Sequence, residues 1–314
     1  MRRISTIAAM KAASRQVTRA GKTLGFVPTM GALHEGHLSL VRASRARCDV
    51  TAVSIFVNPL QFGPAEDLDK YPRQLERDAA MLEELGVELL FVPTAEEMYG
   101  QPTLSPKAGD EGGAPKQPTL SPKGGEQGGA LTSESKTYVV VEGLSDRLDG
   151  ASRPGHFRGV ATVVAKLFEI MRPHYAFFGQ KDAVQVAVLR KMVRDLDMDV
   201  EIVVCPIVRE PDGLAMSSRN VYLTPEQRKQ ALVLHRALMR VQMEADQGER
   251  DGGKLRTIGV DAVAEEPGAR LDYFAVVDPD TIEPVSDVSR GALVAVAAYF
   301  GGTRLIDNIV LAPR

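Results

Sequence analysis

The sequence predicts an α/β protein, with a Rossmann-like parallel sheet in an N-terminal domain of residues 1–207 and a smaller α+β C-terminal domain of residues 208–314. A length of 314 residues is enough for two domains at about 150 residues each. Short apolar segments alternate with helical segments in the first part of the chain, as βαβ units require. After Pro206 the alternation stops, and strand-like segments follow one another directly.

The alternation of strands and helices defines the first domain. Residues 24–27 and 51–57 are short, rich in β-formers and apolar on both faces, which is typical of buried parallel strands. Between them, Leu38 and Val41 are three residues apart, a helical spacing that predicts a helix over 37–48. Further strands are expected at 87–92, 175–178 and 200–205, and further helices at 5–20, 75–85, 160–171 and 183–194. Ser5 or Thr6 can cap the first helix, and Gly21 can end it.

The second domain begins with a different pattern. One long helix is expected over 225–247, followed by strands at 273–277, 293–298 and 305–310. No helix of crossover length is expected between these strands, so a small α+β domain fits better than further βαβ units. The domain is expected to act as a lid over the first.

The segment 101–130 interrupts the first domain, and a strand is expected at Tyr138 after it. The segment is rich in Gly, Pro, Ser, Lys and Glu, and the heptapeptide Gln-Pro-Thr-Leu-Ser-Pro-Lys occurs at both 101–107 and 117–123. Such a composition buries too little apolar surface to offset the entropy of ordering, which predicts a disordered surface insertion. A Pro-rich docking site for a partner is the alternative.

Charge and composition exclude several classes of function. The 38 Lys and Arg residues against 41 Asp and Glu give a net charge of −3, which does not support a broad nucleic-acid-binding surface. No apolar run reaches the roughly 18 to 20 residues of a membrane span, and no signal-peptide core follows the basic start. Cys48 and Cys205 are too few for a structural zinc site and are expected to be reduced, buried thiols. We therefore expect a cytoplasmic protein.

The strongest functional pattern is the string Pro-Thr-Met-Gly-Ala-Leu-His-Glu-Gly-His at 28–37, between a strand and a helix. Ligands of open α/β sheets bind at the carboxyl ends of strands, where this loop lies. Gly31 and Gly36 allow close backbone approach, and the helix N-terminus offers free N–H groups to a phosphate. His34 and His37 can donate hydrogen bonds to phosphate oxygens that gain charge in a transition state. Zinc binding, which lacks a third ligand at i+4, and a purely structural pair are the weaker alternatives.

Two later loops also carry residues suited to phosphates. Lys181 and Asp182 follow the strand at 175–178; the lysine supplies a point charge, and the aspartate can take ribose hydroxyls or help position magnesium. The string Gly-Leu-Ala-Met-Ser-Ser-Arg-Asn at 213–220 contains two hydroxyls and a guanidinium, which can clamp a polyphosphate. A solvated loop and a helix-capping Ser-Ser are the plain alternatives.

Covalent catalysis by the protein is not indicated. The sequence has no Gly-x-Ser-x-Gly motif, no cysteine in a glycine-rich loop and no P-loop motif. Phosphate chemistry at these loops would therefore depend on positioning and electrostatics.

These loops resemble those of nucleotidylyltransferases and class I aminoacyl-tRNA synthetases, and longer strings narrow the resemblance to the pantoate–β-alanine ligase (pantothenate synthetase) family. The strings lie at 28–37, 56–62, 71–73, 156–159, 177–182 and 213–220, with C-terminal strings at 272–279 and 302–308. They follow the family order, and the resemblance covers the chain except for about residues 100–136 and 248–268.

The resemblance implies an ATP-dependent ligation of (R)-pantoate and β-alanine to pantothenate. ATP and pantoate would give a pantoyl adenylate and diphosphate, and the amine of β-alanine would then displace AMP. The resemblance also implies Mg²⁺ as the metal, a homodimer formed through the N-terminal domain, and no nucleic-acid or membrane partner.

The resemblance assigns roles to named residues. His37, His34 and Lys181 are the expected catalytic residues, with His37 as a proton donor. The expected ATP-binding residues are Met30, Gly31, Ala32, Leu33, His34, Glu35, Gly36, His37, Gly179, Gln180, Lys181, Asp182, Val208, Met216, Ser217, Ser218 and Arg219. Gln61 and Gln185 are expected to hold pantoate through their amides, and Gln61 also lies at the β-alanine position. The candidate metal group is Asp78, and the residues expected to assist are Arg153 and Arg158.

Two rival functions share part of this pattern. A different adenylyltransferase would keep the histidine loop but would not need Gln61 and Gln185, and such chains are usually shorter. A non-catalytic nucleotide-binding module would be marked by a lost catalytic residue, whereas His34, His37 and Lys181 are all present. A tRNA-binding synthetase is disfavoured by the acidic balance and by the lack of an anticodon domain.

Overall fold

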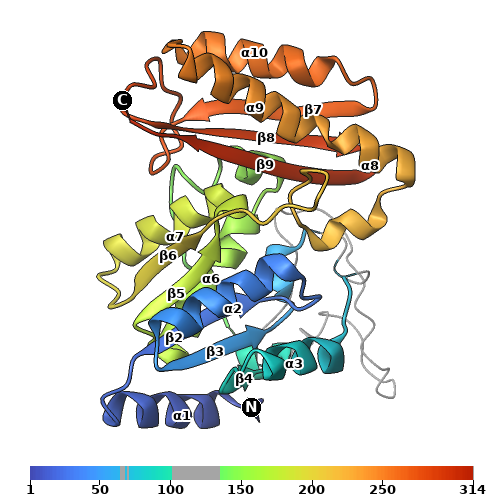
Figure 1. Cartoon of the computed structure of the whole chain (residues 1–314). Coiled ribbons are helices and arrows are strands. Elements are labelled where there is room, and N and C mark those ends of the chain that lie inside the picture. The colour runs from blue at the N-terminus through green and yellow to red at the C-terminus, as the bar shows by residue number, and fades with distance from the viewer. Residues whose placement is uncertain (64–67, 69–70, 101–134, 314) are drawn as a thin grey trace, which may run out of the picture.

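The structure, a computed structural model, describes residues 1–63, 68, 71–100 and 135–313, and it contains two sheets (Figure 1). One is a six-stranded sheet and the other a three-stranded sheet. The predicted fold class, a parallel α/β sheet with a smaller α+β part, is therefore confirmed. The predicted insertion at 101–130 lies outside the described residues.

The first sheet is parallel throughout, with the strand order β1-β4-β3-β2-β5-β6. Its strands are β1 (Arg2–Ile4), β2 (Leu24–Thr29), β3 (Val50–Ile55), β4 (Leu89–Phe91), β5 (Tyr175–Gly179) and β6 (Glu201–Cys205). All but β1 were predicted, with ends that differ by a few residues. β1 has only three residues, of which only Ile4 is buried, so it has no apolar run to mark it.

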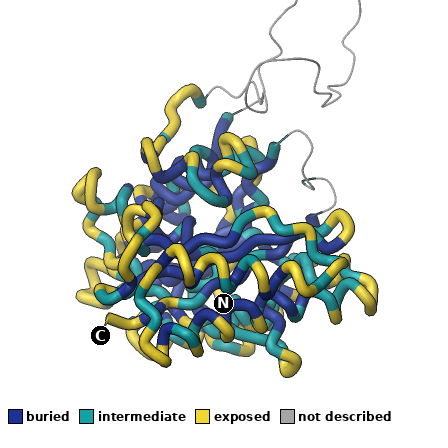
Figure 2. The backbone as a smooth tube through the Cα atoms, turned by 90° about the horizontal axis from the view of Figure 1, so that it is seen from above, coloured by how far each residue is buried: buried dark blue, intermediate teal, exposed yellow. Residues whose placement is uncertain are grey.

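Helices cover both faces of this sheet. They are α1 (Ile7–Arg19), α2 (Glu35–Arg47), α3 (Leu75–Glu84), α4 (Ala95–Tyr99), α5 (Asp149–Ser152), α6 (His156–Met171) and α7 (Ala183–Asp195). Alternate residues of β2 belong to opposite cores: Phe26 lies in the core with α1, α6 and α7, and Val27 in the core with α2 and α3. This two-sided burial explains why the central strands of the sheet carry apolar residues on both faces. Figure 2 shows the buried residues concentrated inside the molecule, beneath an exposed rim.

The second sheet is an antiparallel meander covered by helices on one face. Its strands are β7 (Ala269–Val277), β8 (Ala292–Phe300) and β9 (Thr303–Leu311), and its helices are α8 (Pro225–Ala231), α9 (Val233–Asp246) and α10 (Gly252–Ala264). Gly301 and Gly302 join β8 to β9, and Gly301 has the positive φ (59°) that tight hairpins require. Val277 and Leu293 belong to the same apolar cluster as Phe157 of α6, so packing continues between the two parts. The domain boundary at residue 207 stays a prediction.

Two predictions for the second part need correction. The single helix expected over 225–247 is interrupted at Leu232, whose N–H bonds to the carbonyl three residues back, at Lys229. α10 was missed because glycines occupy its buried side. A Cβ on Gly252 would lie 2.1 Å from Val285 O, and one on Gly259 would lie 2.1 Å from the Phe274 ring. These glycines lower helix propensity but allow close packing.

The strand expected at Tyr138 is also wrong. Residues 135–141 form no strand; instead the Val139 N–H donates to Thr162 Oγ1 on α6, 3.0 Å away. α6 itself begins at His156, four residues before the expected start, so that His156 and Arg158 lie in its first turn. Among the described residues, no helix is long and apolar enough to cross a membrane.

Candidate active site

The strand order of the first sheet reverses between β2 and β5. From β2 the chain continues outward through β3 and β4, whereas from β5 it continues in the opposite direction to β6. Ligand sites of open α/β sheets form outside the carboxyl ends of the strands at such a reversal. The loop with His34 and His37 follows β2, and the turn η2 (Gln180–Asp182) follows β5. The two predicted phosphate loops therefore meet at this point.

The two histidines are fixed by hydrogen bonds at the start of α2. His34 is the N-cap residue, and its Nδ1 accepts from the Gly36 N–H at 3.2 Å. His37 Nδ1 accepts from the His34 N–H at 3.4 Å. Since both Nδ1 atoms accept, each neutral ring carries its proton on Nε2. The pair thus offers two N–H donors at the switch point.

The surroundings of both histidines favour the neutral form. Burial, followed by the positive charge of Lys181, lowers the pKa of His34 to about 4. Burial, followed by the neighbouring His34 ring, lowers the pKa of His37 to about 3. Both rings are therefore neutral at pH 7 and can donate hydrogen bonds.

The Asp78 carboxylate holds the histidine loop through backbone hydrogen bonds. Its side chain is fully buried on α3, and its two carboxylate oxygens accept from the N–H groups of Ala32 (2.8 Å) and Leu33 (3.0 Å). Ala32 has a φ of 52°, a left-handed conformation that costs energy for a residue with a Cβ. The carboxylate stabilises this conformation, and a role in magnesium binding stays a prediction.

The Lys181 turn is held by β9. Asn308 Nδ2 donates to the carbonyls of Gln180 (3.0 Å) and Lys181 (2.9 Å), and the Gln180 amide donates back to Asn308 Oδ1 at 3.0 Å. Lys181 Nζ lies 3.5 Å from Asp182 Oδ1. Asn308 and Gln180 thus hold the turn that presents Lys181 and Asp182, and Gly179 directly precedes it.

The segment 213–220, called the clamp segment from here on, lies next to the histidine loop. Met216 N–H donates to Val208 O at 3.0 Å, and a Cβ on Gly36 would lie 3.9 Å from the Met216 side chain. Ser217 is the N-cap of η3 (Ser218–Tyr222) and accepts from the Arg219 N–H. The Ser217 hydroxyl therefore caps this turn, while a phosphate role for the segment stays a prediction.

The predicted pantoate residues lie on two sides of the site. Gln61 ends η1 (Pro59–Gln61); its Nε2 lies 3.2 Å from Met30 Sδ, and its carbonyl lies 2.8 Å from His156 Nδ1. Gln185 lies on α7, one turn after Lys181. The Nη1 atom of Arg153 lies 3.0 Å from His156 Nε2.

A cavity of about 550 Å³ is lined by residues of α5, α6, the Lys181 turn, α7, the segment 217–222 and the β8–β9 hairpin. The predicted residues that line it are Arg153, Lys181, Asp182, Gln185, Ser217 and Arg219. His34, His37, Gln61 and Met216 are not among the residues that line it, and Met30, Gly31 and Asp78 line a second cavity of about 280 Å³. Arg158 is not among the lining residues, and its guanidinium lies over the Tyr138 ring, 4.7 Å from the centroid.

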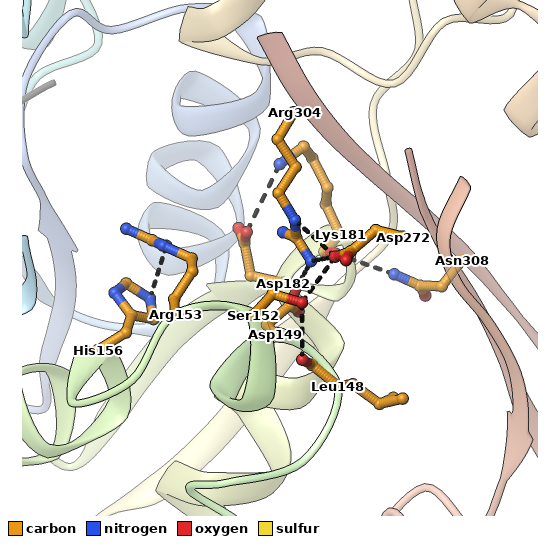
Figure 3. Close-up of polar contacts among 10 residues, drawn as sticks. All are labelled: Leu148, Asp149, Ser152, Arg153, His156, Lys181, Asp182, Asp272, Arg304 and Asn308. Atoms are coloured by element: carbon orange, nitrogen blue, oxygen red, sulfur yellow. Dashed lines mark hydrogen bonds and ion pairs between the residues drawn. The ribbon is translucent and has the colours of Figure 1, made fainter. Parts of the chain in front are cut away.

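Sequence reasoning missed a charged cluster in the same cavity (Figure 3). Arg304 on β9 pairs with Asp149 of α5 at 2.7 Å and with Asp272 of β7 at 2.8 Å, and the Ser152 hydroxyl donates to Asp272 at 2.7 Å. Burial alone would lower the pKa of Arg304, but the two carboxylates more than offset this and raise it. The available signal was the charged Arg304 within β9, a strand that also carries Thr303, Asp307 and Asn308.

Comparison with known proteins decides the family. The family model for pantoate-beta-alanine ligase matches residues 2–310. The chain belongs to the pantoate–β-alanine ligase family. The predicted resemblance is confirmed, and with it the class of enzyme, a ligase.

Relatives with this family name cover almost the whole chain. A pantothenate synthetase from Koribacter versatilis is 56% identical over 311 residues, which are 99% of this chain and 96% of that protein. One from Acetivibrio thermocellus is 51% identical over 99% of both chains.

Solved structures of the family share the fold. Pantothenate synthetase from Thermus thermophilus matches with a TM-score of 0.83 and 46% identity over 100% of both chains. The ligase from Francisella tularensis, solved in complex with beta-gamma ATP and beta-alanine, matches with a TM-score of 0.72 and 30% identity, covering 99% of this chain and 97% of that one.

Proposed function

We propose that the 550 Å³ cavity binds ATP and (R)-pantoate, forms pantoyl adenylate, and then transfers the pantoyl group to β-alanine, giving pantothenate and AMP. The observation that carries this is the meeting of two neutral histidines and the Lys181 turn at the reversal of strand order. The Francisella relative's complex with a nucleotide and beta-alanine supports the choice of ligands. Membership of the ligase family supports the overall reaction.

In the first step, a pantoate carboxylate oxygen bonds to the α-phosphorus of ATP, and the bond from phosphorus to diphosphate breaks. The carboxylate is already ionised at pH 7, so this step needs no general base. It needs donors that stabilise charge developing on the phosphate oxygens. We assign this role to the Nε2–H groups of His34 and His37 and to the Lys181 ammonium. Burial lowers the pKa of His37 to about 3, so its ring is neutral in the free protein and can donate a hydrogen bond through Nε2–H.

In the second step, the neutral amine of β-alanine attacks the acyl carbon, AMP leaves with the former carboxylate oxygen, and the amine nitrogen loses one proton to solvent. We assign Gln61 and Gln185 to pantoate, since amide side chains can both donate to its carboxylate and accept from its hydroxyls. Gln61 extends from η1 toward Met30, where it can also contact the incoming β-alanine. Ser217, Ser218 and Arg219 complete the phosphate site and, with the second part acting as a lid, exclude water from the adenylate.

Mg²⁺ is the expected metal, and it would neutralise the phosphates of ATP. The described residues contain no group of three or more His, Cys, Asp or Glu side chains that could hold a metal alone. This fits a magnesium ion that reaches the site with ATP and keeps several waters. Among the side chains that line the cavity, Asp182 can contact such an ion; Asp78 is the alternative from the family resemblance.

Three further features complete the proposal. We expect a division into domains at about residue 207, a homodimer formed through the first domain, and a cytoplasmic location. Each rests on the sequence and on the family resemblance.

The reaction is tested by product analysis with each substrate omitted in turn. With ATP and pantoate alone, we expect one equivalent of diphosphate and a bound acyl adenylate; AMP release should require β-alanine. Release of ADP would contradict adenylate formation. Turnover with a nucleoside monophosphate in place of pantoate would contradict the proposal and indicate a different adenylyltransferase.

Lys181→Ala tests the assignment of the site. Removal of one strong electrostatic donor typically slows turnover by about 10²- to 10³-fold. Lys191→Ala is the matched control, because this lysine lies on α7, the helix that follows the Lys181 turn, and pairs with Asp195 one turn later. The control should retain its rate; a Lys181→Ala variant with an unchanged rate would contradict the assigned role.

A further inference from the structure

Asn308 crosses from the second sheet to the phosphate site. It lies on β9, and its side chain is buried, with only 3% of the residue exposed. Arg304 and Asn308 are four residues apart and share one face of the strand, as alternation along a strand requires. Both bond to residues of the first part: Arg304 to Asp149, and Asn308 to the Lys181 turn. This face of β9 therefore contacts the first part at two points (Figure 3).

The hydrogen bonds of Asn308 fix the turn in one position. Its Nδ2 group uses both hydrogens, one on Gln180 O and one on Lys181 O, while its Oδ1 accepts from the Gln180 side chain. A rotated amide would place its oxygen against two carbonyl oxygens, so only this orientation satisfies all three groups. A short turn of three residues with no side-chain cap of its own is thereby held from another element.

Asp307, the residue before Asn308, is linked through Arg209 to the clamp segment. Asp307 accepts two hydrogen bonds from the Arg209 guanidinium, at 2.7 and 2.9 Å, and one from the Asn308 N–H at 2.8 Å. Arg209 also donates to Gly213 O at 3.0 Å, at the start of the clamp segment. One dipeptide of β9 is thus bonded both to the Lys181 turn and to the segment that leads to Arg219.

We infer that Asn308 is a positioning residue for adenylate formation, which acts by holding the backbone of the Lys181 turn so that the ammonium group faces the phosphates of ATP. The inference rests on the proposed role of Lys181. Asn308 is not assigned any contact with substrate. Since displacement of a catalytic group by about 1 Å can cost about 10²-fold in rate, a side chain that fixes the turn can control turnover without touching the substrate.

The direct test is a double-mutant cycle on the first half-reaction, measured as diphosphate release with ATP and pantoate. Asn308→Ala should slow this step by about 10- to 100-fold. In a Lys181→Ala background the same substitution should slow it by less than about twofold, because the group that it positions is absent. Transfer from preformed adenylate to β-alanine should be unchanged in Asn308→Ala.

Two further variants keep the test decisive. If Asn308→Ala does not fold, Asn308→Ser replaces it, because its hydroxyl is too short to reach both carbonyls. We expect it to slow diphosphate release and to leave transfer to β-alanine unchanged. Arg147→Ala is the matched control for loss of a contact with the second part, since Arg147 pairs with Glu283 at 2.9 Å, outside the residues that line the cavity. Its rates should equal those of the parent.

The outcomes separate the inference from the proposed function. If Lys181→Ala leaves diphosphate release unchanged, the role assigned to Lys181 is wrong. If Lys181→Ala slows release and the loss caused by Asn308→Ala is multiplied in the double variant, the lysine role stands and the positioning role is wrong. Equal slowing of both half-reactions by Asn308→Ala and Asn308→Ser would indicate general loss of structure and would also overturn the inference.

Discussion

The immediate surroundings of the two histidines at the start of α2 determine their tautomer and their charge. Their Nδ1 atoms accept backbone hydrogen bonds, which holds the proton of each neutral ring on Nε2. The neighbouring Lys181 charge further lowers the pKa of His34, so a cation placed for phosphate also keeps this ring neutral. Electrostatics and hydrogen bonding thus favour the same form.

We therefore predict that neither histidine becomes charged between pH 8 and pH 5 in the free protein. Their pKa values of about 4 and 3 lie below the ordinary 6.5. The unfolded chain takes up these protons first, so the stability contributed by the neutral rings is complete above about pH 6.5 and decreases as pH falls toward 4. NMR titration of the ring signals checks this directly. A midpoint near pH 6.5 for either ring would contradict the described surroundings.

At the scale of elements, the close approach of α6 to η1 positions Gln61. Gly159 allows this approach, because a Cβ there would lie 2.2 Å from Leu60 O. The Gly159 carbonyl also accepts from Asn58 Nδ2 at 3.1 Å. The segment that carries Gln61 is therefore packed directly on the helix backbone.

Gly159→Ala should separate α6 from η1. We expect a loss of about 1–3 kcal/mol in the free energy of unfolding, typical of overpacking, and a rise of at least about tenfold in KM for pantoate. KM for ATP should change little, because the nucleotide loops lie on other elements. Glu169→Ala, at an exposed position on the same helix, is the control. Chemical denaturation and steady-state kinetics measure both effects; unchanged pantoate KM in a destabilised variant would show that η1 does not position Gln61.

The same scale shows what the sequence could predict. β2 and β3 were predictable because burial on both faces leaves short segments rich in β-formers with apolar residues on both faces. α10 was not, because Gly252 and Gly259 serve close packing that is visible only in three dimensions. The histidine loop was predictable from its spacing. The partnership of Asn308 with Lys181 was not, since it joins residues 127 positions apart and leaves no local pattern.

At the scale of the whole molecule, the flanks of the segment 101–130 meet. The Ser135 N–H donates to Tyr99 O at 3.3 Å, so a short linker can join the two described ends. None of the site residues assigned above lies within the segment. Removal of residues 101–130 would therefore leave every assigned site residue in the chain.

Replacement of residues 101–130 by a short Gly/Ser turn should leave KM for ATP and pantoate within about threefold of the parent. Loop-closure free energy changes by only about 0.6 kcal/mol per doubling of loop length, so the stability of the fold should change little. Steady-state kinetics and thermal unfolding of the shortened chain test this. Loss of adenylate formation on deletion would show that the repeat takes part in the reaction.

The central claim is that the chain activates pantoate as an acyl adenylate at the meeting point of β2 and β5. Pantoate labelled with ¹⁸O in its carboxylate tests it most directly, because one of these oxygens bonds to the α-phosphorus and stays there when the amine displaces AMP. After turnover with ATP and β-alanine, mass spectrometry should find one ¹⁸O atom in AMP and none in diphosphate. Unlabelled AMP, or ¹⁸O in inorganic phosphate accompanied by ADP, would contradict the account.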